Sequence, residues 1–576
     1  MEKSRIQKKS MLLYMAEIFA EHPFLLAAAA CLFSITFAVG KDITMLGAMI
    51  PAAILFLSCI IGAAFISDKS PEKNRRSMMI TLSVMSFLIS ALFAQLLTIS
   101  KKPQMLIIST GFVLVTAAAI YLAAAKEMNT RRAVLLLFIL GFVMRLAYII
   151  AIDIHHKQHD VGSIEDMDGH LGYIAYIAYS LKLPDMDVRE VYQFYHPPLH
   201  HMIAAAWVRI QNMLGIEEAN LWENIQILTL FYSSCCMILC KKIFTQLGLK
   251  GSSLVIAMAI ICFNPTFYIL SGSINNDILS LTFLLGAILN TLYWYKKHTM
   301  GRILCISLCI GLSMMTKLSG WMAAPAVAFI FLYVFFKNIK NKDEVKKNLL
   351  QFTAFLSTCV PLALWFGIKN LITHGVPLTY VMKLSEKSKQ YIGNVPIMQR
   401  LFDFSPKQFS EVGVQFKMYK GLYNEYNPLV ALFKTSAFDE LFTVKYYKDT
   451  AGWDKILFWS VVLVGIIGFV GMIFTFVKDK GMNTILKIFT GILYATYFIS
   501  YYIFCFSFPH VCTENIRYAV PLIVLGAFFF AKAFYAMKQN KNQKTKIVSL
   551  IGTLAMTLIT VVYSVSSVVF YSIVFR

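Results

Sequence analysis

The chain has 576 residues, of which 58% are hydrophobic and only 15% are charged. Soluble domains carry roughly 25% charged residues, so this composition excludes an ordinary soluble protein. The formal charge of +22 would suggest a nucleic-acid ligand on a soluble protein. Here the basic residues sit in short loops between apolar runs, where they act as topology signals, so we expect no nucleic-acid partner.

Apolar runs recur from Phe24 almost to the C-terminus. At about 20 residues, each is long enough to cross a hydrocarbon core of roughly 30 Å. The runs are continuous rather than alternating, which indicates helices and not a barrel. The first run, 24–39, has no convincing cleavage site after it and indicates a retained span. The sequence therefore predicts an all-α polytopic membrane protein.

Basic clusters alternate along the first spans. They precede the first span, follow the second and follow the fourth, and consist of Lys3, Arg5, Lys8 and Lys9, then Lys69, Lys73, Arg75 and Arg76, then Lys126, Arg131 and Arg132. Lys101 and Lys102 are a minor exception. Because basic loops stay inside, we expect a cytoplasmic N-terminus. Residues 1–132 then hold four spans of unknown role, and a fifth span, 133–152, exits on the outer side.

The segment after the fifth span, 153–196, is polar, acidic and aromatic. Its acidic character is the wrong sign for a cytoplasmic loop, and it is too long for a simple connector. Apolar residues at helical spacing between Gly169 and Leu181 predict a helix lying along the membrane surface. Pro197 and Pro198 are expected to stop that helix and to set the start of the next one.

Two acidic residues of this loop, Asp160 and Asp168, are candidates for a general base that takes a proton from an acceptor. Asp168 equally fits the N-terminus of the surface helix, so the choice between them stays open. Arg145 lies about two turns below the loop and must meet a carboxylate or carbonyls inside the bundle, because an unpaired arginine in lipid is costly. The accompanying histidines are His159, His170 and His196.

Ten further apolar runs follow, near 225–239, 254–270, 278–294, 303–315, 322–336, 352–368, 456–476, 485–506, 518–534 and 547–573. Lysine clusters at 337–347 and 538–546 are expected in the cytoplasm, and 370–454 outside. If every apolar run between Tyr195 and Asn275 crossed the membrane, these two residues would not both lie on the outer side. Either 197–214 does not fully cross, or Pro265 divides a broken segment.

Three polar features interrupt these later runs. The stretch 271–277 contains Asn276 and Asp277, which either cap the next helix or form a polar ledge at a site. Lys317 lies between two apolar runs, where it either snorkels to the interface or meets a lipid-linked phosphate. Arg517 opens a late span, and its guanidinium offers the paired donors that a phosphate clamp needs.

In this order the features resemble the large membrane glycosyltransferases of the GT-C fold, especially the protein mannosyltransferase-like and aminoarabinose transferase-like group (glycosyltransferase family 39-like). The matching positions are Arg145, His159-Asp160, Asp168 to Tyr173, His196 to Leu199, Asn275 to Asp277, Thr316-Lys317 and Arg517 to Pro521. The resemblance covers roughly residues 132–538. The chain departs from the family's common Asp-Glu pair followed closely by tyrosine, and Asp168 has the more usual spacing from the tyrosine and the Pro-Pro-Leu element.

The resemblance implies a GT-C-like transmembrane helix bundle with outer-face surface helices. It divides the chain into four N-terminal spans (1–132), a catalytic membrane module (133–369) with its first outer loop (153–196), an extracytoplasmic region (370–454) and C-terminal spans (455–576). It implies transfer of a hexose or pentose from a polyprenyl-phosphate donor to an extracytoplasmic protein, lipid or glycan. Asp160 is its carry-over for the catalytic base, and arginine or lysine would stabilise the leaving phosphate.

The sequence says less about a cofactor and about the membrane in which the protein lies. No cofactor is required, although a divalent metal would be compatible with the carboxylates. A zinc site from His155, His156 and His159 has no fixed ligand pattern behind it. The absence of a retention signal favours a bacterial plasma membrane.

Two other classes of function compete with an enzyme. A polytopic transporter or lipid flippase predicts charged residues near the middle of several spans, whereas here they gather at the outer ends. A structural subunit of an envelope complex would not need the clustered His/Asp loop. The sequence names neither the sugar nor the acceptor.

Overall fold

The computed structural model describes residues 22–38, 72–99, 102–124, 126–156, 158–409, 425–439, 452–540 and 546–574, a few positions between 49 and 63, two short strands, and Thr450. The strands β1 (Met418–Tyr419) and β2 (Leu422–Tyr423) pair antiparallel, and all other regular structure is helical. The protein is therefore all-α, as predicted. The basic cluster at residues 3–9, together with Lys69 and Lys101, lies outside the described residues.

Within the described residues, eleven helices or continuous helix pairs are long and apolar enough to cross a membrane. They are α4 (Glu72–Ile99), α5 (Pro103–Ala124), α6 (Thr130–Ala151), α9 (Glu218–Glu223) with α10 (Ile225–Gln246), α13 (Asp277–Lys296), the 3-10 helix η1 (Leu318–Ala323) with α15 (Ala324–Lys337), α16 (Lys342–His374), α20 (Trp453–Val477), α21 (Thr484–Ser507), α22 (Pro521–Gln539) and α23 (Lys546–Val574). This confirms a multi-pass membrane protein. Shorter apolar helices are α2 (Pro23–Ala38), α14 (Met300–Thr316) and α18 (Pro428–Phe438).

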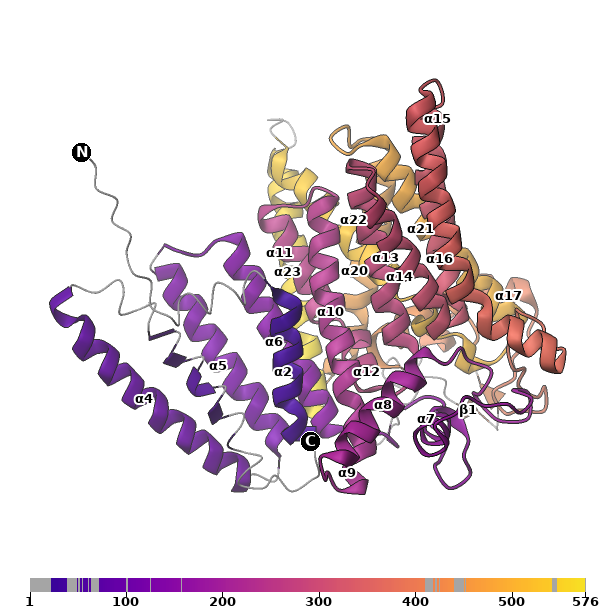
Figure 1. The fold of residues 1–576 in the computed structure, drawn as a ribbon. Coiled ribbons are helices and arrows are strands. Elements are labelled where there is room, and N and C mark those ends of the chain that lie inside the picture. The colour runs from indigo at the N-terminus through magenta and orange to yellow at the C-terminus, as the bar shows by residue number, and fades with distance from the viewer. Residues whose placement is uncertain are drawn as a thin grey trace.

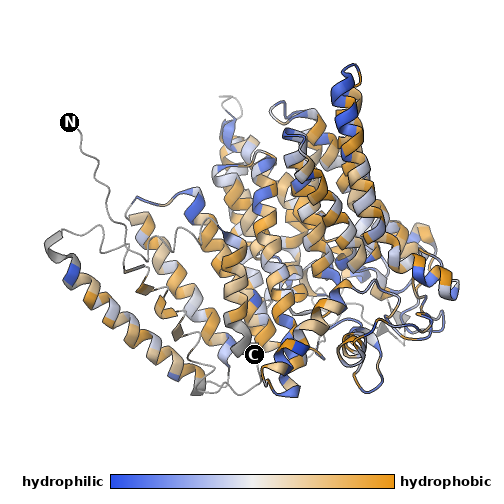
Figure 2. Ribbon diagram, viewed as in Figure 1, coloured by the Kyte–Doolittle hydropathy of each residue, from blue (hydrophilic) through white to orange (hydrophobic). Residues whose placement is uncertain are grey.

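Most of these helices stand side by side, and the short helices gather at one end of the bundle (Figure 1). That end carries α7 (Gly169–Ser180), α8 (Leu199–Met213) and α17 (Ile397–Phe402), and we call it the loop-rich end. The turn between α15 and α16, with its lysines, lies at the opposite, basic end (Figure 2). The helix predicted at 169–181 is confirmed as α7.

The first explanation closes the alternation of sides, and the second describes the shape of the span that follows. α8 has 15 residues and is not among the candidate spans. α11 (Gly251–Cys262) and α12 (Pro265–Gly272) pass the span test only together and bend by 45° at the break before Pro265. The chain therefore leaves Tyr195, crosses in α10, and returns through the broken pair to Asn275 at the same loop-rich end.

Arg145 stabilises this break. Proline supplies no backbone N–H, so carbonyls one turn before Pro265 lose their helical partner. Nη1 of Arg145 donates to the Cys262 carbonyl at 3.0 Å and to the Gly141 carbonyl at 2.8 Å, and Nε donates to Ser233 Oγ at 2.9 Å. The fully buried guanidinium thus meets carbonyls, one of the two environments expected for it.

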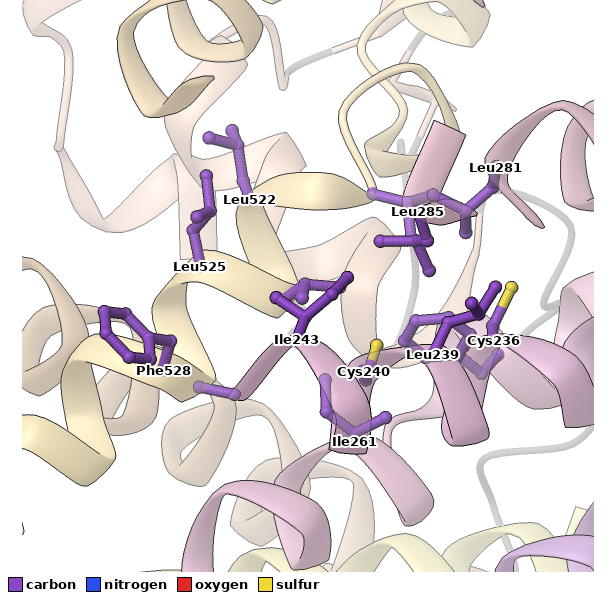
Figure 3. Close-up of a cluster of buried hydrophobic side chains, with 14 of the residues drawn as sticks. Cys236, Leu239, Cys240, Ile243, Ile261, Leu281, Leu285, Leu522, Leu525 and Phe528 are labelled. Atoms are coloured by element: carbon purple, nitrogen blue, oxygen red, sulfur yellow. The ribbon is translucent and has the colours of Figure 1, made fainter. Parts of the chain in front are cut away.

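The bundle core is continuous and contains several of the cysteines. Cys236, Cys240 and Ile243 of α10 pack in one cluster with Leu285 of α13 and Phe528 of α22 (Figure 3). Both thiols are fully buried among aliphatic and aromatic groups. They fill space there as small hydrophobes do.

α20 and α22 approach closely because of glycines. A Cβ at Gly471 of α20 would lie 2.4 Å from the Phe529 carbonyl oxygen of α22, whereas a Cβ at Gly526 would meet nothing within 4 Å. Small residues at such crossings let two backbones approach in a membrane bundle.

We expect Gly471→Ala to lower the stability of the detergent-purified protein by about 1–3 kcal/mol, because the new methyl group forces α20 and α22 apart. The melting temperature, followed by intrinsic fluorescence, should fall by several degrees. Gly526→Ala is the matched control and should melt like the wild type. Equal melting of the two variants would contradict this account of the crossing.

Candidate functional site

A cavity of about 410 Å³ opens at the loop-rich end of the bundle. Its lining comes from the first loop, the start of α13, η1, α16, the end of α21 and the segment that precedes α22. Seven of the ten residues predicted for a site line it, namely Asp160, His170, His196, Asn276, Asp277, Lys317 and Arg517. The fold therefore brings together groups that lie in four separate parts of the sequence.

Asp160 is held at both carboxylate oxygens. The Tyr192 hydroxyl donates to Oδ1 at 2.5 Å, and Nη1 of Arg517 donates to Oδ2 at 3.1 Å. The backbone of Asp160 has φ +58°, a left-handed conformation that aspartate tolerates better than most residues. Its carbonyl accepts from the His170 N–H at 2.9 Å, which ties the loop to the first turn of α7.

The electrostatic surroundings keep this carboxyl ionised. Burial alone would raise its pKa, but the Arg517 guanidinium, His159 and the Tyr192 hydroxyl together hold the pKa of Asp160 well below its usual range. At neutral pH Asp160 is therefore a carboxylate with two firm partners.

Asp277 and Lys317 complete a group of four charges with Asp160 and Arg517, which we call the charge cluster. Lys317 Nζ pairs with Asp277 Oδ1, and Arg517 Nη1 lies 3.9 Å from Asp277 Oδ2. Asp277 is the first residue of α13, where the helix dipole favours a negative charge. Both cations also lie over the Tyr518 ring, with Lys317 Nζ 5.0 Å and Arg517 Cζ 4.8 Å from its centroid.

The ledge before α13 is built by side-chain hydrogen bonds. Asn275 Oδ1 accepts from the Asp277 N–H at 3.1 Å, so Asn275 does the capping. Asn276 instead donates from Nδ2 to the Thr316 carbonyl at 2.8 Å and fixes the residue before Lys317. Asn276 and Asp277 therefore form the predicted polar ledge, whereas Asn275 caps the helix.

The segment that carries Arg517 is anchored from behind. Arg400 of α17 donates to the Glu514 carboxylate at 2.8 Å, and both side chains are buried. Burial raises the pKa of Glu514 to about 7, although Arg400 acts in the opposite direction. The Ile516 N–H donates to Thr435 Oγ1 at 2.8 Å. The position of Arg517 thus depends on 370–454, the region predicted to lie outside.

Four histidines form a wall at the cavity, where His170 and His196 line it and His200 and His201 lie behind them; all are buried except the half-buried His196. His170 stacks on His196 and on His201, and its Nδ1 hydrogen-bonds His201 Nε2 at 2.9 Å. His200 Nε2 donates to the Ile274 carbonyl at 2.7 Å. Burial lowers the pKa of His196 to about 3 and that of His200 to about 4, and it lowers those of His170 and His201 well below the ordinary value. The histidine wall is therefore neutral.

Three predicted site residues do not line the cavity. Arg145 holds the α11–α12 break. Asp168 is the N-cap residue of α7, but its side chain accepts from the Ser163 N–H at 2.9 Å and closes the turn before the helix. His159 Nε2 lies 2.8 Å from the Asp439 carboxylate, which also accepts from Asn515 Nδ2 at 2.8 Å. Of the two candidate bases, only Asp160 faces the cavity.

Sequence reasoning did not single out Tyr192, Tyr195 or Asp439. Tyr195 lines the cavity, and its ring lies 4.3 Å from that of His196. Tyrosines are frequent in this chain, and nothing local distinguishes these two. Asp439, at the end of α18, lies 280 residues from His159, its partner.

The other half of the cavity is apolar. Its wall is formed by Trp321 and Met322, by Leu364 of α16, and by Ile503 and Phe504 of α21. Trp321 and Ile503 are exposed at 42% and 59% on the flank of the bundle. An amphipathic molecule could therefore place its polar end at the charge cluster and its hydrocarbon along this wall.

Among the described residues, no group of three or more His, Cys, Asp or Glu side chains is arranged to hold a metal ion. Each carboxylate of the charge cluster instead faces a cation. A divalent metal, which the sequence leaves open, would have to compete with Lys317 and Arg517.

Comparison with known proteins adds no assignment. No protein-family model matches the chain, and no curated protein matches it. A function for this cavity therefore has to be inferred from its own residues.

We expect the melting temperature of the purified protein to fall as the pH drops from 7 to 5. Below about pH 6.5 the histidines take up protons in the unfolded chain but not in the buried wall, so acid favours unfolding. In His200→Gln, which keeps a donor for the Ile274 carbonyl, the melting temperature should fall less over the same pH range. His155→Gln, at an exposed position, should fall as steeply as the wild type. An unchanged slope in His200→Gln would contradict a neutral wall.

Proposed function

We propose that the protein is a membrane glycosyltransferase that moves a sugar from a polyprenyl-phosphate donor to an acceptor outside the cytoplasm. The observation that carries the proposal is a single cavity in which a fixed carboxylate, Asp160, and two cations, Lys317 and Arg517, meet an apolar wall. A polyprenyl-phosphate sugar has the matching parts in the same order: a sugar, an anionic phosphate and a long hydrocarbon. The resemblance to GT-C glycosyltransferases rests on the same charged residues.

The reaction follows from the position of each charge. An acceptor oxygen attacks the anomeric carbon, and the bond from that carbon to the phosphate oxygen breaks with its electron pair staying on the phosphate. Lys317 and Arg517 stabilise the charge that develops there, and the guanidinium can contact two phosphate oxygens at once. The proton of the acceptor passes to the carboxylate of Asp160.

The orientation of the chain supports an outer site. The turn between α15 and α16 carries lysines and lies at the end opposite the loop-rich end (Figure 1), and α6 begins with Arg131 and Arg132. Basic loops stay in the cytoplasm, which supports an outer location for the loop-rich end. A bacterial plasma membrane fits this arrangement.

A transporter or flippase is less well supported. Its ion path would need charged groups along the depth of the bundle. The charge cluster lies at one end, and Arg145, deeper in the bundle, is engaged by the Cys262 carbonyl at the helix break, by the Gly141 carbonyl and by the Ser233 hydroxyl. That arrangement suits a fixed structural role.

We expect Asp160→Asn to reduce sugar transfer at least about 100-fold, because general-base catalysis typically contributes that much. The assay uses protein in nanodiscs, radiolabelled polyprenyl-phosphate hexoses and pentoses, and membranes from cells lacking the gene as the acceptor source. Asp187→Asn removes the same charge from the same loop, outside the cavity lining, and should stay active. Wild-type rates in Asp160→Asn would refute the catalytic role, and transfer from no donor would refute the function.

The outer location predicts a labelling pattern in intact cells. A cysteine replacing Glu190, exposed in the first loop, should react with a membrane-impermeant maleimide without permeabilisation. A cysteine replacing Lys342, exposed at the basic end, should react only after permeabilisation. The parent protein, with its native cysteines, gives the background. The reverse pattern would place the cavity in the cytoplasm and exclude the proposed donor geometry.

A further inference from the structure

The two cations that would bind the donor's phosphate each have an anionic partner within the protein. Arg517 Nη1 donates to Asp160 Oδ2 at 3.1 Å, and Lys317 is paired with Asp277. The charge cluster holds two positive and two negative groups, so it presents no net charge to an incoming anion. A phosphate that takes the place of a carboxylate on one of these cations gains the hydrogen bond that the carboxylate now holds.

The same pairing limits Asp160 as a base. Its Oδ1 accepts from Tyr192 and its Oδ2 from Arg517, so both oxygens have donors. The low pKa of Asp160 agrees with this geometry, since burial would raise it while the guanidinium and its other neighbours lower it more strongly. While Arg517 holds Oδ2, the carboxylate is a poor acceptor for a further proton.

We propose that Asp160 occupies the donor's phosphate position on Arg517, and that the arriving phosphate displaces this carboxylate and so frees Oδ2 to accept the proton of the acceptor. This coupling rests on the proposed function. Phosphate offers the guanidinium two oxygens, so it can replace the single Asp160 contact with a bidentate one. The base therefore becomes competent only when the donor is bound, and the acceptor reacts second.

The structure gives Tyr192 a distinct part in this exchange. Its hydroxyl holds Oδ1 of Asp160 at 2.5 Å, whereas Arg517 holds Oδ2. When Arg517 turns to the phosphate, Tyr192 is the contact that keeps the carboxylate aimed into the cavity. Tyr192 is thus a positioning residue that acts through Asp160.

The test is equilibrium binding of radiolabelled polyprenyl monophosphate, without sugar, to the full chain in nanodiscs. Asp160→Asn should bind this probe roughly three- to tenfold more tightly than the wild type, the range expected for releasing a partly buried ion pair. Asp187→Asn, with the same charge change at the surface of the loop, should bind like the wild type.

A double-mutant cycle separates displacement from simple repulsion between Asp160 and the probe. If Asp160 acts by occupying Arg517, the gain from Asp160→Asn disappears in an Arg517→Met background and persists in a Lys317→Met background. Repulsion alone would give the same gain in all three backgrounds and would overturn the proposal. Arg517→Gln replaces Arg517→Met if the latter does not purify as a monodisperse protein.

Tyr192→Phe provides a second readout. It should bind polyprenyl monophosphate like the wild type, while kcat for sugar transfer falls about tenfold with little change in the donor's KM. A rise in KM alone would contradict the positioning role.

The outcomes distinguish the coupling from the function on which it rests. Absence of saturable probe binding to the wild type would refute the donor class and the coupling together. Binding to the wild type with no gain in Asp160→Asn would refute only the coupling.

Discussion

The ion pair between Asp160 and Arg517 joins residues 357 positions apart and closes the candidate site. Burying either charge alone at the edge of a membrane bundle would be expensive, so each needs its partner. Because the pair spans the first loop and the segment before α22, everything that places those two segments also shapes the cavity. Breaking one side would leave the other charge partly buried and unbalanced.

Three side-chain contacts place the two segments. His159 and Asn515 both meet Asp439, which connects the first loop, the end of α18 and the segment before α22. Arg400 and Glu514 pin that last segment to α17. The region between α16 and α20 therefore acts as a frame around the site, and its polar contacts are buried where water would otherwise weaken them.

The bilayer as solvent explains why polar chemistry gathers at one end. Inside the bundle, Arg145 satisfies the Cys262 carbonyl at the α11–α12 break and the Gly141 carbonyl of its own helix, and the first contact supports the return of the chain to the loop-rich end. At that end the charge cluster has neutral histidines on one side and an apolar wall on the other. A molecule with an anionic head and a hydrocarbon tail is the ligand that we propose for this cavity.

The sequence alone predicted the multi-pass helical fold, the helix at 169–181 and most of the polar groups of the candidate site, because hydropathy, helical spacing and the cost of charge in lipid act on short stretches of chain. It could not choose between Asp160 and Asp168, since both are acidic residues of one loop; the choice depends on which carboxylate faces Arg517. It also placed Arg145 and His159 at the site, whereas their partners are carbonyls at a helix break and a distant aspartate. The contacts of Tyr192 with Asp160 and of Asp439 with His159 are known only from the folded chain. Such pairings are fixed by packing between segments hundreds of residues apart, and no local pattern encodes them.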